Sequence, residues 1–439
     1  MKVEGLASQG EQIQLVEEFA ESMAAAVPAQ GYWVALSGGL DSMVLAHLAQ
    51  QVLPAVRFIH INHGLSPHAE AWQQQVVSWA QSIGLAGVCL SVQVEKSGLS
   101  LEAAARAARY QAFESILKPG EALLCGHHQQ DQAETFCLRL MRGSGLTGLA
   151  AMAPSRPLGC AVLLRPLLNI PRARLLAYAQ AHRFNWVEDE SNQDLRFDRN
   201  WLRHALIPTL AQRWPNASEQ IAQTCLRLQQ EQQLLQEYLA ADLLACAPRA
   251  ERLGHSMLLA PLAQGSDGRR SGILRCWFDS LGTLPPSQAV LAQMHALIHS
   301  RADSEACVSW GHWHLRRYNG RLYVLSQVPA LSPDWQAQWH TQVPLLLANG
   351  SCVSAAPSAE GLAPGTYTLR LRQGGERSHP AQRQHSQTLK KLLQEAALEP
   401  WLRNQLPLVY RDNCLVAVGD LWLERGHSVV NGVQLKWHF

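Results

Sequence analysis

Short apolar runs alternate with longer amphipathic stretches along residues 1–215 of the chain. The apolar runs are short enough to be buried strands, and they predict strands at Tyr32–Leu36, Ala55–Ile61, Gly87–Val94 and Ala122–Gly126. In the stretches that follow them, apolar residues recur every three or four positions, which predicts helices at Ser42–Gln51, Ala69–Ile83, Ser100–Leu117 and Asp131–Arg142. Alternation of this kind is typical of an α/β fold in which helices cover both faces of a parallel sheet.

From residue 216 onward the pattern becomes mainly helical. Ser218–Leu244 is a long amphipathic stretch rich in Gln and Leu, and shorter helices are expected at Arg269–Leu281 and Gln288–Ser300. Val308–Leu325 is expected to form a β-hairpin, because it contains Asn319-Gly320, a dipeptide typical of tight hairpin turns. These elements predict a second, mainly helical domain.

The last part of the chain mixes strands with one basic helix. Segments rich in Pro, Ser and Ala at Gln327–Asp334 and Ser354–Pro364 predict a linker. Strands are expected at Tyr367–Arg372 and Leu415–Val418, with a basic helix at Leu389–Ala397. A chain of 439 residues is long enough for two to three domains. We therefore expect a catalytic domain at 1–215, a mainly helical domain at 216–335 and a small α+β domain at 336–439.

Composition narrows the class of protein. No apolar run approaches the ~20 residues that a membrane-spanning helix needs, and the first residues are polar, which predicts a cytoplasmic protein without membrane contact. The ten cysteines include no C-x-x-C pair, which argues against a zinc ribbon or a thioredoxin-like site. The net charge of +2 does not indicate a particular class of partner. Arg165–Arg213 and Arg370–Arg403 each carry an excess of basic residues, and each could be a surface that binds nucleic acid or an ordinary solvated face.

Three polar clusters follow predicted strands, at the edge where parallel sheets bind ligands. Ser37-Gly38-Gly39-Leu40-Asp41-Ser42 follows the first strand, and the other clusters are His60–His63 and Gly126–His128. The two glycines allow backbone N–H groups to approach an anion, and the helix that follows presents its positive end to phosphate. The turn lacks the Gly-Lys-Ser/Thr of a Walker A loop. Asp41 would repel polyphosphate directly, so we expect this carboxylate to bind Mg²⁺ between itself and the phosphates.

Two further sets of charged residues lie near this turn in the predicted fold. Asp131 and Glu134 are three positions apart on a helix and share one face, where they could bind Mg²⁺ or the ammonium of a substrate. Arg106 and Arg109 have the same spacing on the preceding helix, and guanidinium groups suit negative charge that develops on phosphates. The alternatives are ordinary ones: acidic residues that complement a helix dipole and arginines exposed to solvent.

Taken together, the motifs resemble those of the tRNA(Ile)-lysidine synthetase family of PP-loop ATP-pyrophosphatases. They are SGGLDS, HINHGL, AARAARY, GHHQQDQAET and DRNWLRH, followed near the end of the chain by LKKLL and PWLR. SGG-x-D-S alone would indicate only the PP-loop superfamily, whose fold is adenine nucleotide α-hydrolase-like. The resemblance covers nearly the whole chain and implies the long, three-domain type.

The resemblance implies that lysine is joined to C2 of cytidine 34 in the CAU anticodon of tRNA(Ile), with ATP and Mg²⁺ as cofactors. An adenylated intermediate releases pyrophosphate, and attack by lysine then releases AMP and gives lysidine. A homodimer is left open. The implied roles fall into four groups: the ATP turn at Ser37–Ser42; catalysis by Asp41, Arg106, Arg109, His127 and Asp131; lysine binding by Asp131, Glu134 and Arg199; and tRNA binding by Arg203, Arg377, Lys390, Lys391 and Arg403.

One residue departs from the family pattern, since Gln130 precedes Asp131 where the family usually has two aspartates. We expect Asp131 to be the functional one, because it keeps its spacing to Glu134. Two alternatives stay open: another PP-loop enzyme of the tRNA thiolase type, and a tRNA-binding relative with impaired catalysis.

Overall fold

The computed structural model describes residues 8–64, 66–93, 101–283, 286–301 and 306–439. The chain forms two compact units, Met1–Leu234 and Leu235–Phe439, each of which is described here by itself. In the described residues, no helix is long and apolar enough to cross a membrane. The Ser100 end of one predicted helix lies outside the described residues.

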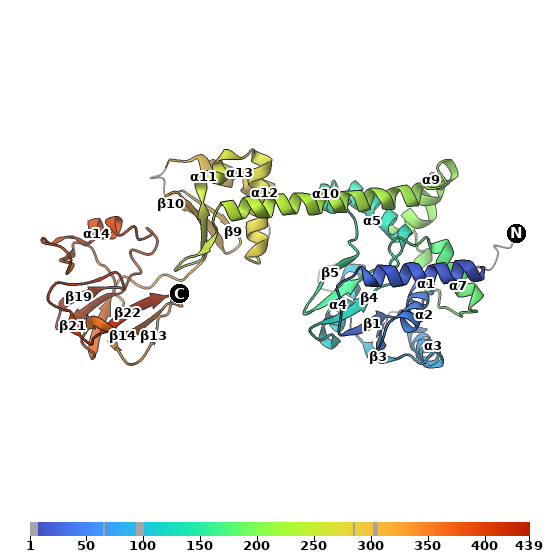
Figure 1. Ribbon diagram of the computed structural model, residues 1–439, viewed down its shortest axis with the longest axis horizontal. Coiled ribbons are helices and arrows are strands. Elements are labelled where there is room, and N and C mark those ends of the chain that lie inside the picture. Colours follow the sequence, from blue (N-terminus) through green and yellow to red (C-terminus); the bar gives the residue numbers. More distant parts are fainter. Residues whose placement is uncertain (1–7, 65, 94–100, 284–285, 302–305) are drawn as a thin grey trace. The chain divides into compact units, whose positions relative to one another are not determined.

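The first unit is built on a six-stranded sheet with the order β3-β2-β1-β4-β6-β5 (Figure 1). Its strands are β1 (Gly31–Ala35), β2 (Val56–Asn62), β3 (Ala86–Ser91), β4 (Glu121–Leu124), β5 (Ser155–Leu158) and β6 (Ala161–Leu164). All neighbours are parallel except β5, which pairs antiparallel with β6 at the edge. The parallel sheet predicted from the sequence is confirmed, with an antiparallel edge hairpin in addition.

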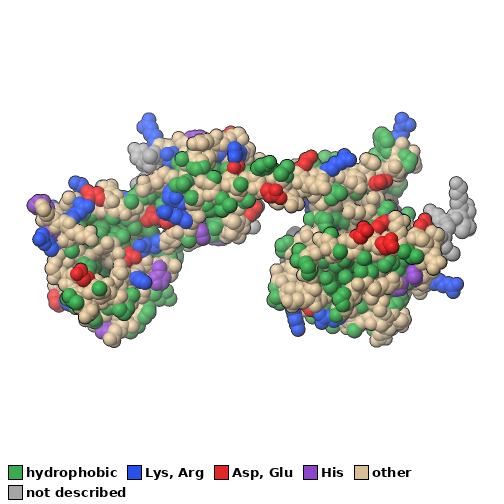
Figure 2. Space-filling model, viewed as in Figure 1, with side chains coloured by type: hydrophobic (Ala, Val, Ile, Leu, Met, Phe, Trp, Pro, Cys, Tyr) green, Lys and Arg blue, Asp and Glu red, His purple; other side chains and the backbone are tan. Residues whose placement is uncertain are grey.

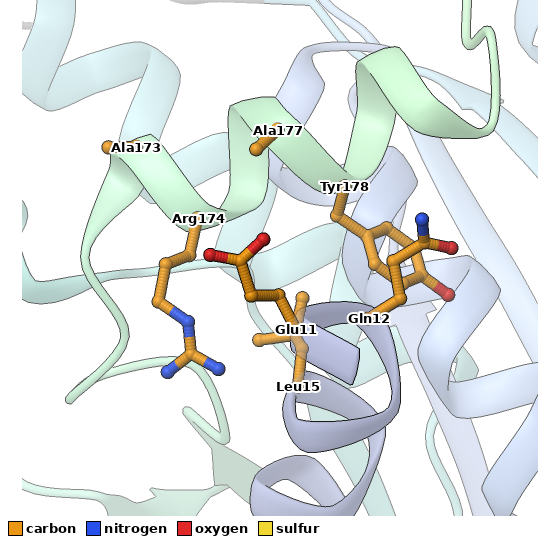
Figure 3. Close-up of a pocket in the computed structure, with 7 residues that line it drawn as sticks. All are labelled: Glu11, Gln12, Leu15, Ala173, Arg174, Ala177 and Tyr178. Atoms are coloured by element: carbon orange, nitrogen blue, oxygen red, sulfur yellow. The ribbon is translucent and has the colours of Figure 1, made fainter. Parts of the chain in front are cut away.

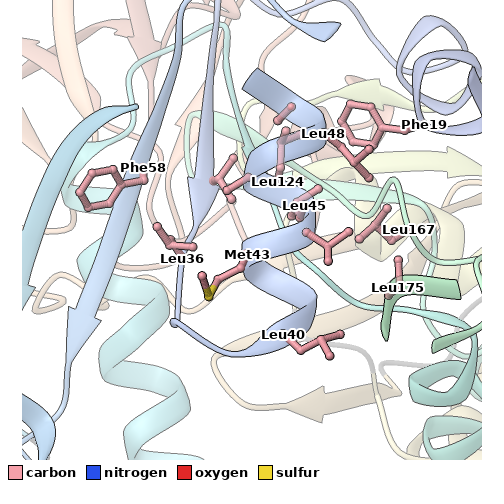
Figure 4. Packing of buried hydrophobic residues seen from close by; sticks show 14 of the residues in the cluster. Phe19, Leu36, Leu40, Met43, Leu45, Leu48, Phe58, Leu124, Leu167 and Leu175 are labelled. Carbon is pink, nitrogen blue, oxygen red and sulfur yellow. The ribbon is translucent and has the colours of Figure 1, made fainter. Parts of the chain in front are cut away.

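Helices cover both faces of this sheet, as the alternation of its buried side chains requires. The helices of this unit are α1 (Gln9–Ala24), α2 (Leu40–Val52), α3 (Ala69–Ser82), α4 (Leu101–Ile116), α5 (Gln129–Met141), α6 (Leu146–Leu149), α7 (Arg172–Ala181), α8 (Asp198–Trp201) and α9 (Ile207–Arg213), with short turns η1 (Glu190–Gln193) and η2 (Leu202–Leu206). Val34 and Leu124 belong to the core that also contains side chains of α1, α2 and α7. Figure 4 shows Leu124 beside Leu45 of α2 in this core. Trp33 and Leu123 point to the other face, against Phe113 of α4. Burial of each large side chain contributes about 2 kcal/mol, so the two cores fix the strand register.

The second unit begins within α10 (Ala217–Ala245) and contains two groups of strands and helices. In the first group, α11 (Leu259–Gln264), α12 (Asp267–Ser280) and α13 (Gln288–His299) pack on an antiparallel sheet with the order β7-β8-β11-β10-β9. Its strands are β7 (Arg249–Ala250), β8 (His255–Leu258), β9 (Cys307–Trp310), β10 (Trp313–Tyr318) and β11 (Arg321–Ser326). The predicted hairpin is confirmed, because Asn319 and Gly320 both have positive φ between β10 and β11. Of the strands in this sheet, the sequence predicted only those of the hairpin.

The second group surrounds a separate apolar core that includes Trp339, Tyr367 and Trp437. Its elements are β12 (Gln336–His340), β13 (Leu345–Leu346), β14 (Cys352–Leu362), β15 (Thr366–Arg370), β16 (Arg377–Ser378), β17 (Gln387–Thr388), α14 (Leu389–Glu395), β18 (Leu408–Arg411), β19 (Cys414–Val418), β20 (Trp422–Leu423), β21 (Val429–Val430) and β22 (Val433–His438). The predicted boundaries at 215 and 335 stay a prediction.

The linker predicted at Ser354–Pro364 is wrong, because most of this segment lies in β14. β14 pairs with β22, and buried Val353 and Leu362 anchor it in the core. The register shifts after Pro357, where an irregularity lets a strand hold a proline. The composition in Pro, Ser and Ala suggested a linker, and the local sequence did not reveal the strand because its partner lies about eighty residues further along the chain.

Candidate functional site

The turn between β1 and α2 is shaped by its glycines and serines. Gly38 has φ +89°, and a Cβ there would lie 2.6 Å from the side chain of Val76, so no larger residue fits without a shift. The Ser42 hydroxyl donates to the carbonyl of Gly39 (2.9 Å) and accepts from the backbone N–H of Ser37 (3.2 Å). In the described structure no side chain caps α2 at Gly39. The first N–H groups of the helix are therefore free of a side-chain cap and suited to an anion.

The loop after β4 packs directly against this turn. A Cβ on Gly126 would lie 3.0 Å from the carbonyl oxygen of Asp41, so glycine allows the two loops to approach. His128 is 1% exposed, and its Nε2 lies 3.6 Å from carboxylate oxygens of both Asp41 and Asp131. One imidazole thus links the Ser37–Ser42 turn to the start of α5.

The pKa values of the two adjacent histidines are shifted in opposite directions. Burial by itself would lower the pKa of His128, but its interactions with Asp41 and Asp131 outweigh this and raise it. Burial lowers the pKa of His127 to about 3, and nearby Arg165 contributes in the same direction. His128 is therefore the histidine suited to carry a proton between two carboxylates, while His127 is neutral.

Asp131 and Glu134 lie together on α5, and each forms ion pairs with the same two arginines. Arg199 binds Glu134 through Nε (2.6 Å) and Asp131 through Nη2 (2.9 Å). Arg203 binds Glu134 through Nε (2.6 Å) and Asp131 through Nη2 (3.2 Å). Burial alone would raise the pKa of Asp131, but His128 and Arg199 hold it below its usual value. The four side chains form an ion cluster with two charges of each sign.

The arginines of this cluster come from a distorted helical segment. Arg199 lies on α8, and Arg203 lies four residues later in η2, a π-helical turn. A four-residue spacing places both side chains on one helix face, and π-turns occur often at functional sites. Arg203, which was predicted to bind tRNA, contacts the carboxylates instead in this structure, and its tRNA role stays a prediction.

Gln130 turns away from the carboxylates. Its side-chain oxygen accepts a hydrogen bond from the backbone N–H of Arg172 (2.9 Å), the first residue of α7. An amide oxygen does this as well as a carboxylate would. Gln130 therefore caps α7, and the ion cluster is complete without it.

The predicted arginines of α4 lie in different surroundings. Arg109 is largely buried, and burial lowers its pKa; it also lies close enough to His63 to lower the pKa of that histidine. Arg106 is exposed, and its guanidinium stacks over Tyr110 at 5.0 Å from the ring centre. Arg109 is therefore the more buried of the two, and Arg106 is exposed but close enough to His127 to lower the pKa of that histidine.

The four basic residues predicted in the C-terminal part lie in the second unit. Lys390 and Lys391 are exposed on α14, and Arg377 is exposed and donates to Ser386. Arg403 donates to the carbonyl of Leu398 and to the Tyr318 hydroxyl (3.0 Å). The two lysines and Arg377 can reach a partner, whereas Arg403 uses its donors within the protein.

The surroundings of Asp41 fit its predicted role as a ligand of Mg²⁺. Its Oδ1 is buried and has no hydrogen-bond partner in the described structure, and Arg172 Nε approaches it only to 3.9 Å. No group of three or more His, Cys, Asp or Glu in the described residues could hold a metal by itself. This suits Mg²⁺, which commonly binds through one or two carboxylates together with substrate phosphates and water.

A cavity of about 200 Å³ lies elsewhere, between α1 and α7 (Figure 3). It is lined by Glu11, Gln12, Leu15, Ala173, Arg174, Ala177 and Tyr178. None of these residues belongs to the predicted site, so this cavity is not part of it.

Sequence reasoning missed two residues of this site. His128 makes the contacts to both aspartates, although His127 was predicted as the catalytic one. Arg172 approaches Asp41 from the start of α7, a helix that was not predicted from the sequence. The repeated histidine was a signal for the first residue, while the second depends on a contact between distant segments.

Comparison with known proteins accounts for most of the chain. A model of the PP-loop domain matches residues 11–210, one of the TilS substrate binding domain matches 258–323, and one of the TilS substrate C-terminal domain matches 367–437. The tRNA(Ile)-lysidine synthase of Alkalilimnicola ehrlichii is 40% identical, covering 95% of this chain and 96% of the relative. The protein of the same name from Pseudomonas aeruginosa is 40% identical and covers 90% of each chain. Among solved structures, the U34-tRNA thiolase NcsA from Methanococcus maripaludis is 16% identical, with a TM-score of 0.42 over 50% of this chain and 80% of that chain.

Proposed function

Since this chain belongs to the tRNA(Ile)-lysidine synthase family, we propose that it joins lysine to C2 of cytidine 34 in a CAU-anticodon tRNA(Ile) at the expense of ATP. The first unit would hold ATP, lysine and the target base. The second unit would bind the body of the tRNA, which Lys390 and Lys391 of α14 support because they are exposed and basic.

ATP would bind with its phosphates at the Ser37–Ser42 turn. The uncapped start of α2 supplies N–H donors, and Asp41 supplies a free carboxylate oxygen for Mg²⁺. The metal would offset phosphate charge while the cytosine oxygen attacks the α-phosphate and pyrophosphate leaves. Arg109 adds positive charge at the same edge of the sheet.

Lysine would bind at the ion cluster on α5. Free lysine carries an ammonium and a carboxylate, and the cluster offers Asp131 and Glu134 for the first and Arg199 for the second. Because Arg203 already bonds both acids, lysine would have to displace that guanidinium. In its neutral form His128, whose pKa the two aspartates raise, would accept the proton that the amine loses on attack.

One observation supports the proposal above the others. His128 lies within 3.6 Å of Asp41, in the phosphate-binding turn, and of Asp131, in the cluster for lysine. A reaction that adenylates a base and then presents an amine to it needs the two subsites side by side. Either subsite alone would suit many ATP-dependent enzymes.

The test is incubation of the purified protein with ATP, labelled lysine and unmodified tRNA(Ile). We expect AMP release that depends on lysine, together with label in the tRNA. Absence of AMP in the presence of all substrates would contradict any enzymatic function and favour a tRNA-binding relative. AMP release that depends on a sulfur donor and not on lysine would favour a thiolase. The absence of C-x-x-C among the ten cysteines makes that second function less suited to this chain.

A further inference from the structure

Three arginines without acidic partners gather beside the proposed site. Arg106, Arg156 and Arg165 come from α4, β5 and the end of β6. Within the part of the chain that the structure describes, none has a carboxylate at ion-pair distance. Figure 1 shows α4 near β4 and β5, and their side chains share one apolar cluster. We call these three residues the arginine group.

Tyr110 brings two members of the group together. The Arg106 guanidinium lies 5.0 Å from the centre of its ring, and that of Arg156 lies 4.7 Å from it. Arg106 Nη2 also donates to the Tyr110 hydroxyl (3.3 Å). The aromatic ring stabilises each cation, but the two positive charges are held close together and repel each other.

Arg165 contributes the third positive charge of the group and is buried. The residue is only 6% exposed, and its Nη1 donates to the carbonyl of Ala153 (2.6 Å). Its Nε is buried and has no hydrogen-bond partner in the described structure. Burial lowers the pKa of Arg165, and the charges of Arg156 and Arg106 act in the same direction. A buried cation with an unpaired N–H and cationic neighbours is costly unless an anion joins it.

The group adjoins the catalytic edge of the sheet. The charges of Arg165, Arg156 and Arg106 all act on Cys125, where they oppose the larger effect of burial, which raises the pKa of that thiol. Cys125 directly follows β4 (Glu121–Leu124), and its backbone N–H donates to the carbonyl of Leu164, the residue before Arg165 (2.9 Å). His127 follows two residues later. An anion held by the arginine group would therefore lie next to the loop that carries His127 and His128.

The phosphates of ATP already have a proposed subsite at the Ser37–Ser42 turn, which contains none of the three arginines. On the assumption that the proposed function is right, the unassigned anions of the reaction are the phosphodiester groups of the RNA. We propose that Arg156 and Arg106 contact a backbone phosphate next to the modified nucleotide, with Arg165 adding charge behind them. Holding that phosphate would fix the strand while its base enters the site.

The test compares Arg156→Met and Arg165→Met with the wild-type protein by two binding titrations. The ligands are unmodified tRNA(Ile) over a range of salt concentrations, and ATP without RNA. For each variant we expect tRNA affinity to fall about tenfold and the slope of log affinity against log salt to become shallower by about 0.7. ATP affinity should not change. Lys118→Met removes one charge at the amino end of β4, far along the strand from this group, and should leave the salt slope unchanged.

Melting temperatures separate this role from a structural one. Because the arginine group is a set of like charges, Arg156→Met should keep or raise the melting temperature, whereas a structural arginine would lower it. Loss of ATP affinity with unchanged tRNA affinity would overturn the proposal and assign the group to the nucleotide. Unchanged binding of both ligands would overturn it as well. A wild-type protein that makes no lysidine would refute the proposed function, but the RNA titrations would still decide the role of the arginine group.

Discussion

At the scale of the residue, Gln130 stands where we expected a second aspartate. Its oxygen accepts from the first N–H of α7, and its side chain takes no part in the ion cluster. The substitution that suggested impaired catalysis thus has a structural explanation, because an amide and a carboxylate are interchangeable as acceptors for a helix N-terminus.

Replacing Gln130 tests this explanation. Gln130→Asp should keep both stability and lysidine synthesis, whereas Gln130→Ala should lower the free energy of unfolding by about 1 kcal/mol through loss of the cap. Urea unfolding and the tRNA assay measure the two effects, with exposed Gln81→Ala as a control. A Gln130→Ala protein of normal stability but without activity would show that Gln130 acts in the reaction.

Asp41 is the residue on which the proposed ATP subsite depends. Asp41→Ala should abolish AMP formation, because it removes the free carboxylate oxygen proposed for Mg²⁺, while tRNA binding persists. AMP release and tRNA binding are measured on the same preparation, and Asp41→Asn keeps the shape of the side chain. Equal loss of both properties in both variants would indicate that the change had disrupted the fold around His128.

At the scale of the element, the ion cluster of Asp131, Glu134, Arg199 and Arg203 connects α8 and η2 to α5. Glu134 is 0% exposed and accepts three hydrogen bonds from Arg199 and Arg203. The two arginines lie near the start of a continuous helical run formed by α8, η2 and α9, so these bonds, together with buried Leu202 and Ile207, hold that run against the rest of the unit.

Glu134→Gln should therefore destabilise the first unit by about 3 kcal/mol, since it leaves a guanidinium charge without its partner. Adding Arg203→Met should restore part of this loss, because the remaining Arg199 and Asp131 then match in charge. Denaturant unfolding of the single and double variants measures both steps. If the double variant is less stable than Glu134→Gln, the two residues do not form one unit.

At the scale of the whole molecule, basic and acidic side chains are interspersed among apolar and polar ones on the face drawn in Figure 2. We expect exposed basic groups to contribute to the binding of a large RNA, and Lys390 and Lys391 on α14 are examples. Exposed cations release counterions when they meet phosphates, so their effect depends on salt.

The variant with both Lys390→Ala and Lys391→Ala should raise the KM for tRNA and flatten its salt dependence, with kcat unchanged. Steady-state kinetics at several salt concentrations measures this, and the KM for ATP is the internal control. An unchanged salt slope would remove α14 from the RNA interface.

The stability of the fold should also depend on pH through His47. Burial lowers the pKa of His47 to about 4, and the nearby His182 acts in the same direction. The Nδ1 of His47 lies 2.9 Å from the Tyr178 hydroxyl. In the unfolded chain a histidine has a pKa of about 6.5. As the pH falls from about 6.5 to about 4, the unfolded state gains a proton that the folded state does not, so the free energy of unfolding falls.

His47→Gln should make this fall shallower, as urea unfolding at pH 7 and pH 5 can show. His68→Gln, which removes an exposed imidazole, serves as the control. An equal pH dependence of His47→Gln and the wild-type protein would show that His47 is not responsible.

The sequence by itself determined the elements of the first unit and the residues at its sheet edge. Strand and helix periodicity is local, and the glycines and polar side chains of SGGLDS stand directly after a strand, so no distant contact was needed to find them. Asp131 and Glu134 were found for the same reason, through their spacing on one helix.

Only the tertiary structure decided what those residues touch. The pairing of Asp131 and Glu134 with Arg199 and Arg203 joins segments about seventy residues apart, and β14 required a partner strand about eighty residues further along the chain. His128 between the two aspartates and the unpaired Arg165 are likewise products of packing. Charge and spacing along a chain do not reveal which opposite charges meet, because that depends on how whole elements bury their apolar faces.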